Sequence, residues 1–171
     1  GLGDVYKRQY LNSPETAIYK KSAILYNFHR AKQSMRKQNL VVLVEGYTDV
    51  IGLARAGISG VVASCGTSLT QQQVRMLRRQ VDQVVVNFDP DQAGQNATER
   101  SIQLLIEEGL QVRVLTLPGG LDPDEFCERQ GAKGYRKLLD EAPDYFLWLA
   151  DRSRLQFDVG SPGGRITALR S

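Results

Sequence analysis

The fold of this chain is decided by residues 84–94, which read VVVNFDPDQAG. The β-branched run Val84–Val86 predicts a buried strand. The run stops at Asp89 and Asp91, which the stiff residue Pro90 separates, and a helical pattern follows from about residue 93. Ligands bind at the carboxyl ends of parallel strands in open α/β sheets, so the two carboxylates mark a candidate binding site.

Two carboxylates held this close repel each other. At a separation of 4 Å the repulsion is about 1 kcal/mol in water and about 4 kcal/mol at an effective dielectric constant of 20. An oxygen-seeking divalent cation between Asp89 and Asp91 would remove it. The alternative is that the pair only shapes a turn and caps the next helix, as aspartate often does. This pair alone leaves both interpretations open.

Strand and helix patterns alternate along the chain on both sides of this stretch. Four repeats predict an α/β fold with a roughly four-stranded parallel sheet flanked by helices, followed by a helical C-terminal segment. Besides the central strand, strands are predicted at residues 40–44, 60–63 and 111–117. Helices are predicted at residues 17–38, 48–56, 70–79, 93–108, 125–130, 135–141 and 144–156.

Composition places few limits on function. With 171 residues, 42% hydrophobic and 24% charged, the chain suits one packed domain. No apolar run is long enough to cross a bilayer, and Cys65 and Cys127 form neither a metal-binding spacing nor a disulfide framework, so we expect a cytoplasmic protein. The first helix is basic, which fits either a polyanionic partner or a solvated helix face. Its basic residues are Lys20, Lys21, Arg30, Lys32, Arg36 and Lys37.

Acidic residues follow three of the predicted strands. Parallel strands place their carboxyl ends at one edge of the sheet, so these six side chains should converge. Bound Mg²⁺ or Mn²⁺ would neutralise them, and such oxygen-rich sites suit phosphoryl or nucleotidyl transfer. The six acids are Glu45, Asp49, Asp89, Asp91, Asp122 and Asp124.

Five motifs in order resemble the Toprim-containing RNA polymerase domain of bacterial replicative DNA primases (DnaG-type). They cover nearly all of the chain from residue 10 onward. The motifs are Tyr10-Leu11-Asn12-Ser13-Pro14-Glu15-Thr16, Glu45-Gly46-Tyr47-Thr48-Asp49-Val50, Ala63-Ser64-Cys65-Gly66-Thr67-Ser68, Asp89-Pro90-Asp91-Gln92-Ala93-Gly94 and Leu121-Asp122-Pro123-Asp124-Glu125.

The resemblance implies a Toprim-type, Rossmann-like core and an enzyme that copies single-stranded DNA into short RNA primers from ribonucleoside triphosphates. It implies that Glu45, Asp89 and Asp91 are catalytic and that all six acids form the Mg²⁺ or Mn²⁺ environment. Asn12, Ser13 and Lys21 would lie on the nucleotide or nucleic-acid path. A replicative helicase would bind through a region outside this sequence.

The resemblance also implies a domain plan. Residues 10–38 would end the N-terminal polymerase subdomain, residues 39–130 would form the Toprim core, and residues 131–171 would begin a helical subdomain. Residues 1–9 do not resemble what should precede them and are expected to be a non-native or unstructured terminus. We therefore expect a fragment that is weakly active or inactive alone.

Two other functions stay open. One is a topoisomerase or nuclease with the same acidic core, although Gln92, Ala93 and Gly94 stand where type IA topoisomerases carry a third acid. The other is a nucleic-acid-binding fragment without catalytic activity, whose acidic residues merely form turns.

Overall fold

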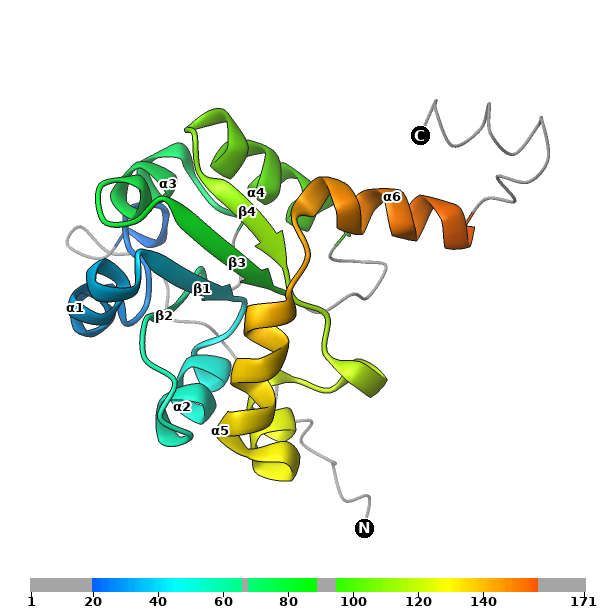
Figure 1. Cartoon of the computed structure of the whole chain (residues 1–171). Coiled ribbons are helices and arrows are strands. Elements are labelled where there is room, and N and C mark those ends of the chain that lie inside the picture. The colour runs from blue at the N-terminus through cyan, green and yellow to red at the C-terminus, as the bar shows by residue number, and fades with distance from the viewer. Residues whose placement is uncertain (1–19, 66–67, 89–94, 157–171) are drawn as a thin grey trace, which may run out of the picture.

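The chain forms a four-stranded parallel sheet with helices on both faces (Figure 1). The computed structural model describes residues 20–65, 68–88 and 95–156. The strands are β1 (Leu40–Val44), β2 (Val61–Ala63), β3 (Gln83–Asn87) and β4 (Gln111–Val114), in the spatial order β2-β1-β3-β4. The predicted fold class is confirmed, with β4 three residues shorter than expected.

The helices divide between the two faces of the sheet. The helical elements are η1 (Lys21–Ala23), α1 (Phe28–Gln38), α2 (Tyr47–Arg55), α3 (Gln71–Arg78), α4 (Gln95–Glu107), η2 (Pro118–Gly120), α5 (Pro123–Glu141) and α6 (Tyr145–Gln156). Helices α1, α3 and α4 cover one face, whereas α2 and α5 cover the other. None of the helices that the structure describes combines the length and apolar composition that a bilayer crossing requires.

Alternate residues of β1 enter different cores. Val41 and Leu43 pack with the α1, α3 and α4 layer, whereas Val42 and Val44 pack with the α2 and α5 layer. All four side chains are at most 2% exposed. This explains why the strands read as continuous apolar runs, because a central parallel strand is buried on both of its faces.

The predicted helix over residues 17–38 is wrong for residues 24–27. In the described part of that range, η1 and α1 are separate, and Asn27 between them has a left-handed φ of 64°. The Asn27 side chain donates to the carbonyl of Val61 at 2.9 Å, and the Tyr26 backbone pairs with Ala63. These long-range hydrogen bonds outweigh the local helical pattern.

Both edges of the sheet carry an isolated antiparallel bridge. Tyr26 pairs with Ala63 on the outer side of β2, and Asp144 pairs with Arg113 on the outer side of β4. Helix α5 has a break at Gly131, whose φ is 71°, which agrees with the two shorter helices predicted there.

Candidate functional site

A pocket of about 100 Å³ lies at the carboxyl ends of the strands. Three of the six predicted acids line it, and they come from the end of β1, the first turn of α2 and the start of α5. The lining residues are Glu45, Asp49, Asn87, Phe88, Leu117, Leu121, Asp122 and Pro123. The parallel topology therefore brings separate acidic loops to one place, as the sequence predicts.

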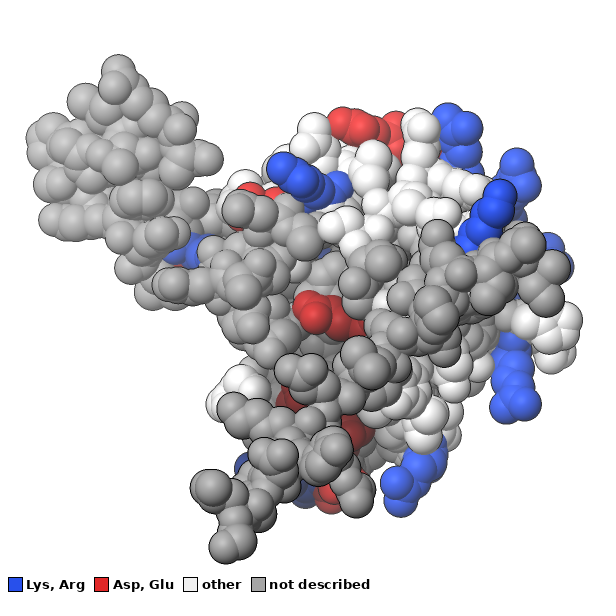
Figure 2. Space-filling view, turned by 180° about the vertical axis from the view of Figure 1, so that it is seen from behind, with Lys and Arg blue, Asp and Glu red and all other residues white. Residues whose placement is uncertain are grey.

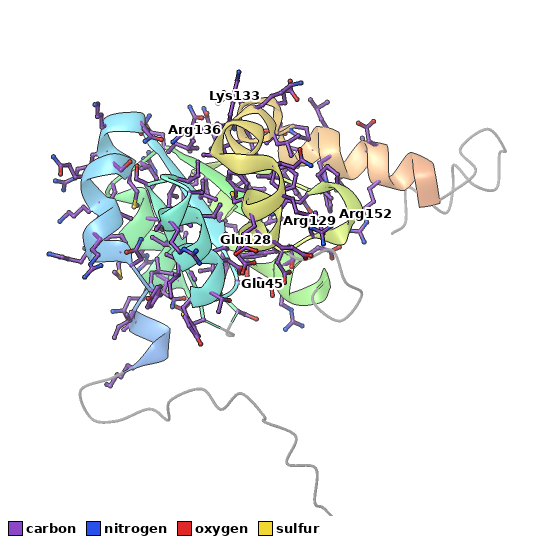
Figure 3. All side chains as sticks on the ribbon, turned by 90° about the horizontal axis from the view of Figure 1, so that it is seen from below. Glu45, Glu128, Arg129, Lys133, Arg136 and Arg152 are labelled. Carbon is purple, nitrogen blue, oxygen red and sulfur yellow. The ribbon has the colours of Figure 1, made fainter. Side chains whose placement is uncertain are left out.

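Glu45 is exposed at the rim of this pocket, directly after the last residue of β1. Figure 3 shows it on the side of the molecule where α5 begins, with Lys133 and Arg136 farther along that helix. Its exposed carboxylate is in reach of a ligand that enters from solvent.

Asp49 is held by the backbone at the start of α2. The amide of Gly46 donates to Asp49 Oδ2 at 3.0 Å. A Cβ atom on Gly46 would lie 3.2 Å from the same oxygen, so glycine gives the carboxylate room to approach the chain. The helix N-terminus favours negative charge, so an aspartate suits this position in the first turn of α2.

Asp122 and Asp124 diverge from each other. Asp122 is the N-cap residue of α5 and faces the 100 Å³ pocket. Asp124 packs against Gly52 of α2 and lines a neighbouring pocket of about 350 Å³. The other residues that line this second pocket are Thr48, Ile51, Gly52, Arg55, Ala56, Cys127 and Glu128. In the structure, Asp124 is thus placed apart from the pocket that Asp122 lines, and its role as a ligand stays a prediction.

The remaining predicted site residues are not placed. Asp89, Asp91, Asn12 and Ser13 lie outside the described residues, and for Lys21 only the backbone, in η1, is described. Within the described ranges, no three Asp, Glu, His or Cys side chains come close enough to hold a metal ion. The described acids therefore supply part of the predicted cluster.

One buried polar network at the pocket has no signal in the sequence. The hydroxyl of Tyr135 donates to Asn87 Oδ1 at 2.8 Å, and Asn87 Nδ2 donates to the carbonyl of Leu115 at 3.2 Å. Tyr135 is fully buried, and this burial raises the pKa of its hydroxyl, which stays protonated as a donor. The network ties α5 to the end of β3, directly before the segment that carries Asp89 and Asp91.

Two family profiles match the sequence. The family described as Toprim-like matches residues 42–127, which is half of the chain. The DNA primase catalytic core, N-terminal domain, matches residues 2–32. The second match includes most of the segment 1–9, which we expected to be a non-native or unstructured terminus.

Similar proteins are DNA primases. The DNA primase of Halalkalibacterium halodurans is 48% identical over 166 residues, which are 96% of this chain and 28% of that protein. The chain spans about a quarter of the length of the curated relatives it matches.

Solved primase structures share the fold. The RNA polymerase domain of Mycobacterium tuberculosis primase DnaG has a TM-score of 0.81 and 31% identity, and the match covers 98% of this chain and 55% of that one. A DnaG primase catalytic domain bound to single-stranded DNA has a TM-score of 0.79 and 34% identity, covering 95% of this chain and 53% of that one.

Proposed function

The chain belongs to the Toprim-like family, and we propose on this basis that it is the catalytic part of a bacterial replicative DNA primase. Such an enzyme synthesises short RNA primers on single-stranded DNA by metal-dependent nucleotidyl transfer. The observation that carries the proposal is the pocket at the carboxyl edge of the sheet, which Glu45, Asp49 and Asp122 all line. The primase relatives and the solved catalytic domain bound to single-stranded DNA support it.

The donor set of the pocket fits Mg²⁺ or Mn²⁺. Its polar lining residues offer carboxylate and amide groups, and neither His nor Cys is among the described residues that line it. Glu45, Asp89 and Asp91 would be the principal ligands, with Asp49, Asp122 and Asp124 completing the metal and triphosphate environment. The bound ion would stabilise the attacking and leaving oxygens of the transfer.

Residues in and beside the pocket would each contribute to this metal environment. Glu45 at the exposed rim would act as the acid/base toward the primer 3′-hydroxyl or as a carboxylate beside the metal. The Gly46 amide fixes the direction of Asp49. Phe88, Leu117 and Leu121 line the same pocket, and their apolar surface lowers the local dielectric constant, which strengthens the attraction between the acids and a cation.

The parts of the chain outside the pocket would contact nucleotide or template and would belong to neighbouring subdomains of the polymerase. Residues 10–38 would end the N-terminal polymerase subdomain, with Asn12, Ser13 and Lys21 near nucleotide or template. Residues 39–130 would form the Toprim core and residues 131–171 the start of a helical subdomain. The helicase would bind outside these 171 residues, and the isolated chain would synthesise little or no primer.

Metal titration tests the proposal directly. We expect the Asp89→Asn/Asp91→Asn variant to lose Mn²⁺ binding in calorimetry, with an unchanged far-UV circular dichroism spectrum, because two of the three principal ligands lose their charge. The matched control is Asp140→Asn/Glu141→Gln, which removes the same charge from exposed positions at the end of α5. Equal Mn²⁺ affinity in both variants would favour acidic turns without a catalytic role.

Activity separates primase from the other Toprim enzymes. The same double substitution in a longer primase chain should abolish primer synthesis from ribonucleoside triphosphates. If the unsubstituted longer chain instead relaxed or cut DNA and made no primer, the topoisomerase or nuclease alternative would replace the proposal.

A further inference from the structure

We propose that Asn87 and Tyr135 are positioning residues that fix one wall of the acidic pocket and thereby favour Mg²⁺ over the larger Ca²⁺. The acidic pocket is the space of about 100 Å³ that Glu45, Asp49 and Asp122 line. The inference rests on the proposed function, because it concerns the cation that this pocket would hold. Asn87 lines the pocket itself, whereas Tyr135 acts through Asn87.

The side-chain amide of Asn87 has a single orientation that satisfies both of its recorded hydrogen bonds. The carbonyl of Leu115 can only accept, so it faces Asn87 Nδ2, which donates to it at 3.2 Å. Asn87 Oδ1 therefore faces the Tyr135 hydroxyl, which donates to it at 2.8 Å. The two bonds hold the amide between the segment after β4 and helix α5.

Asn87 and Tyr135 are buried, unlike the charged side chains that Figure 2 shows on one face of the molecule. Tyr135 is 0% exposed and Asn87 is 5% exposed. At such a depth bulk water does not replace a lost hydrogen-bond partner. Without the Tyr135 hydroxyl, Asn87 Oδ1 loses this donor and the pocket wall loses its fixed position.

On the sheet side, Asn87 joins two walls of the acidic pocket. It pairs with Val44, the residue directly before Glu45 at the rim. It also binds the carbonyl of Leu115, and Leu117, two residues later, lines the pocket. The separation of these two walls therefore depends on Asn87.

On the helix side, Tyr135 connects Asn87 to the acidic start of α5. Its ring packs edge-on against that of Phe126, with 6.3 Å between the ring centroids. Phe126 lies one turn after Asp122, and its amide donates to the Asp122 carbonyl at 2.8 Å. The wall that Asp122 forms is thus tied to Asn87 through two packed aromatic rings and a hydrogen bond.

A wall of fixed position matters most for the smaller cation. Mg²⁺ demands near-ideal octahedral geometry with oxygen ligands about 2.0–2.1 Å away, whereas Ca²⁺ accepts irregular ligand sets at about 2.3–2.6 Å. A small pocket whose walls are fastened to one another suits the stricter ion. Loss of this fastening should therefore reduce the affinity for Mg²⁺ more than the affinity for Ca²⁺.

Removal of a single oxygen atom tests the assignment. We expect Tyr135→Phe to weaken Mg²⁺ binding about tenfold, the usual effect of losing a group that orients metal ligands. Ca²⁺ binding should weaken less than about twofold, because its ligand set is flexible. Each variant is first titrated with Mn²⁺, and both affinities are then measured by displacement of Mn²⁺, followed by electron paramagnetic resonance. The control Tyr145→Phe removes the same atom from a half-buried tyrosine on α6 and should leave both affinities unchanged.

A second substitution tests whether Tyr135 acts through Asn87. Asn87→Leu removes both hydrogen bonds of the amide and should weaken Mg²⁺ binding at least as much as Tyr135→Phe. Adding Tyr135→Phe to Asn87→Leu should then change the Mg²⁺ affinity no further, as expected of two coupled residues. Far-UV circular dichroism at the temperature of the titration verifies that each variant is folded, and Asn87→Ser replaces Asn87→Leu if the latter does not fold.

The outcomes separate positioning from a merely structural role. A reduced folded fraction would weaken Mg²⁺ and Ca²⁺ binding equally, so equal losses in Tyr135→Phe would overturn the inference, as would an unchanged Mg²⁺ affinity. Additive losses in the double variant would overturn the route through Asn87.

The same titrations separate this inference from the proposed function. If the unsubstituted chain bound neither Mn²⁺ nor Mg²⁺, the metal-dependent function would fail and the inference with it. If Asp89→Asn/Asp91→Asn lost Mn²⁺ binding while Tyr135→Phe kept its full Mg²⁺ affinity, the proposed function would stand and only the inference would be overturned.

Discussion

The hydroxyl of Tyr135 on α5 donates to Asn87 at the end of β3 and so holds that strand end in place. Tyr135→Phe removes this donor and leaves the buried Asn87 Oδ1 without its partner. We expect the free energy of unfolding to fall by about 1–3 kcal/mol in urea titration, the usual cost of an unsatisfied buried polar group. Tyr145→Phe, at a half-buried tyrosine on α6, is the control and should change it by less than about 0.5 kcal/mol. Equal stability of Tyr135→Phe and the original chain would show that Asn87 finds another donor.

At the residue scale, the sequence predicts the acids of the pocket better than the residues that support them. Glu45, Asp49 and Asp122 follow from one rule, the convergence of parallel strand ends. Asn87 and Tyr135 are 48 positions apart, and no local spacing marks them as partners. Asp124 is placed away from Asp122 because residues two apart at a helix start point in different directions.

Helices α2 and α5 meet in unusually close contact at Gly52. A Cβ atom there would lie 2.2 Å from Asp124 Cβ and 2.7 Å from its Cα, so the obstacle includes backbone. Gly52→Ala should therefore lower the free energy of unfolding by about 1–3 kcal/mol despite the better helix propensity of alanine. Urea unfolding measures this, with Ala54→Gln at an exposed position of α2 as the control within about 0.5 kcal/mol. A neutral Gly52→Ala would mean that α5 can move away from α2 at little cost.

At the element scale, periodicity predicts the strands and most helices but not the interruption at Tyr26 and Asn27. The apolar spacing of residues 17–38 continues through that point, so a single helix is the natural expectation. What breaks it is the hydrogen bonding of Tyr26 to Ala63 and of Asn27 to Val61, residues more than thirty positions away. A local pattern contains no information about such partners.

The two core layers should unfold together as one molecule. Each of β1 and β3 supplies side chains to both layers, so neither layer can lose its helices without exposing the shared strands. In urea, the fluorescence of Trp148, which packs on the α1, α3 and α4 layer, and far-UV circular dichroism should give one midpoint within error. Two separated midpoints would show that one layer holds its structure without the other.

At the scale of the whole molecule, the repeating strand–helix pattern is sufficient to predict a parallel sheet covered on both faces. The uneven distribution of charge is equally visible in the sequence. Which side of the sheet receives the basic helices follows only from the observed packing, because either face can accept an amphipathic helix with the same apolar spacing.

The two short bridges at the sheet margins have a consequence for how the protein behaves in a crowded solution. Tyr26 occupies part of the outer backbone of β2, and Asp144 part of that of β4, so little of either margin offers unpaired amides and carbonyls to a neighbour. Recruitment of another chain by strand addition is thereby discouraged, and so is fibril-like growth from the folded state. The two sheet margins are therefore poor docking sites for a partner's strand.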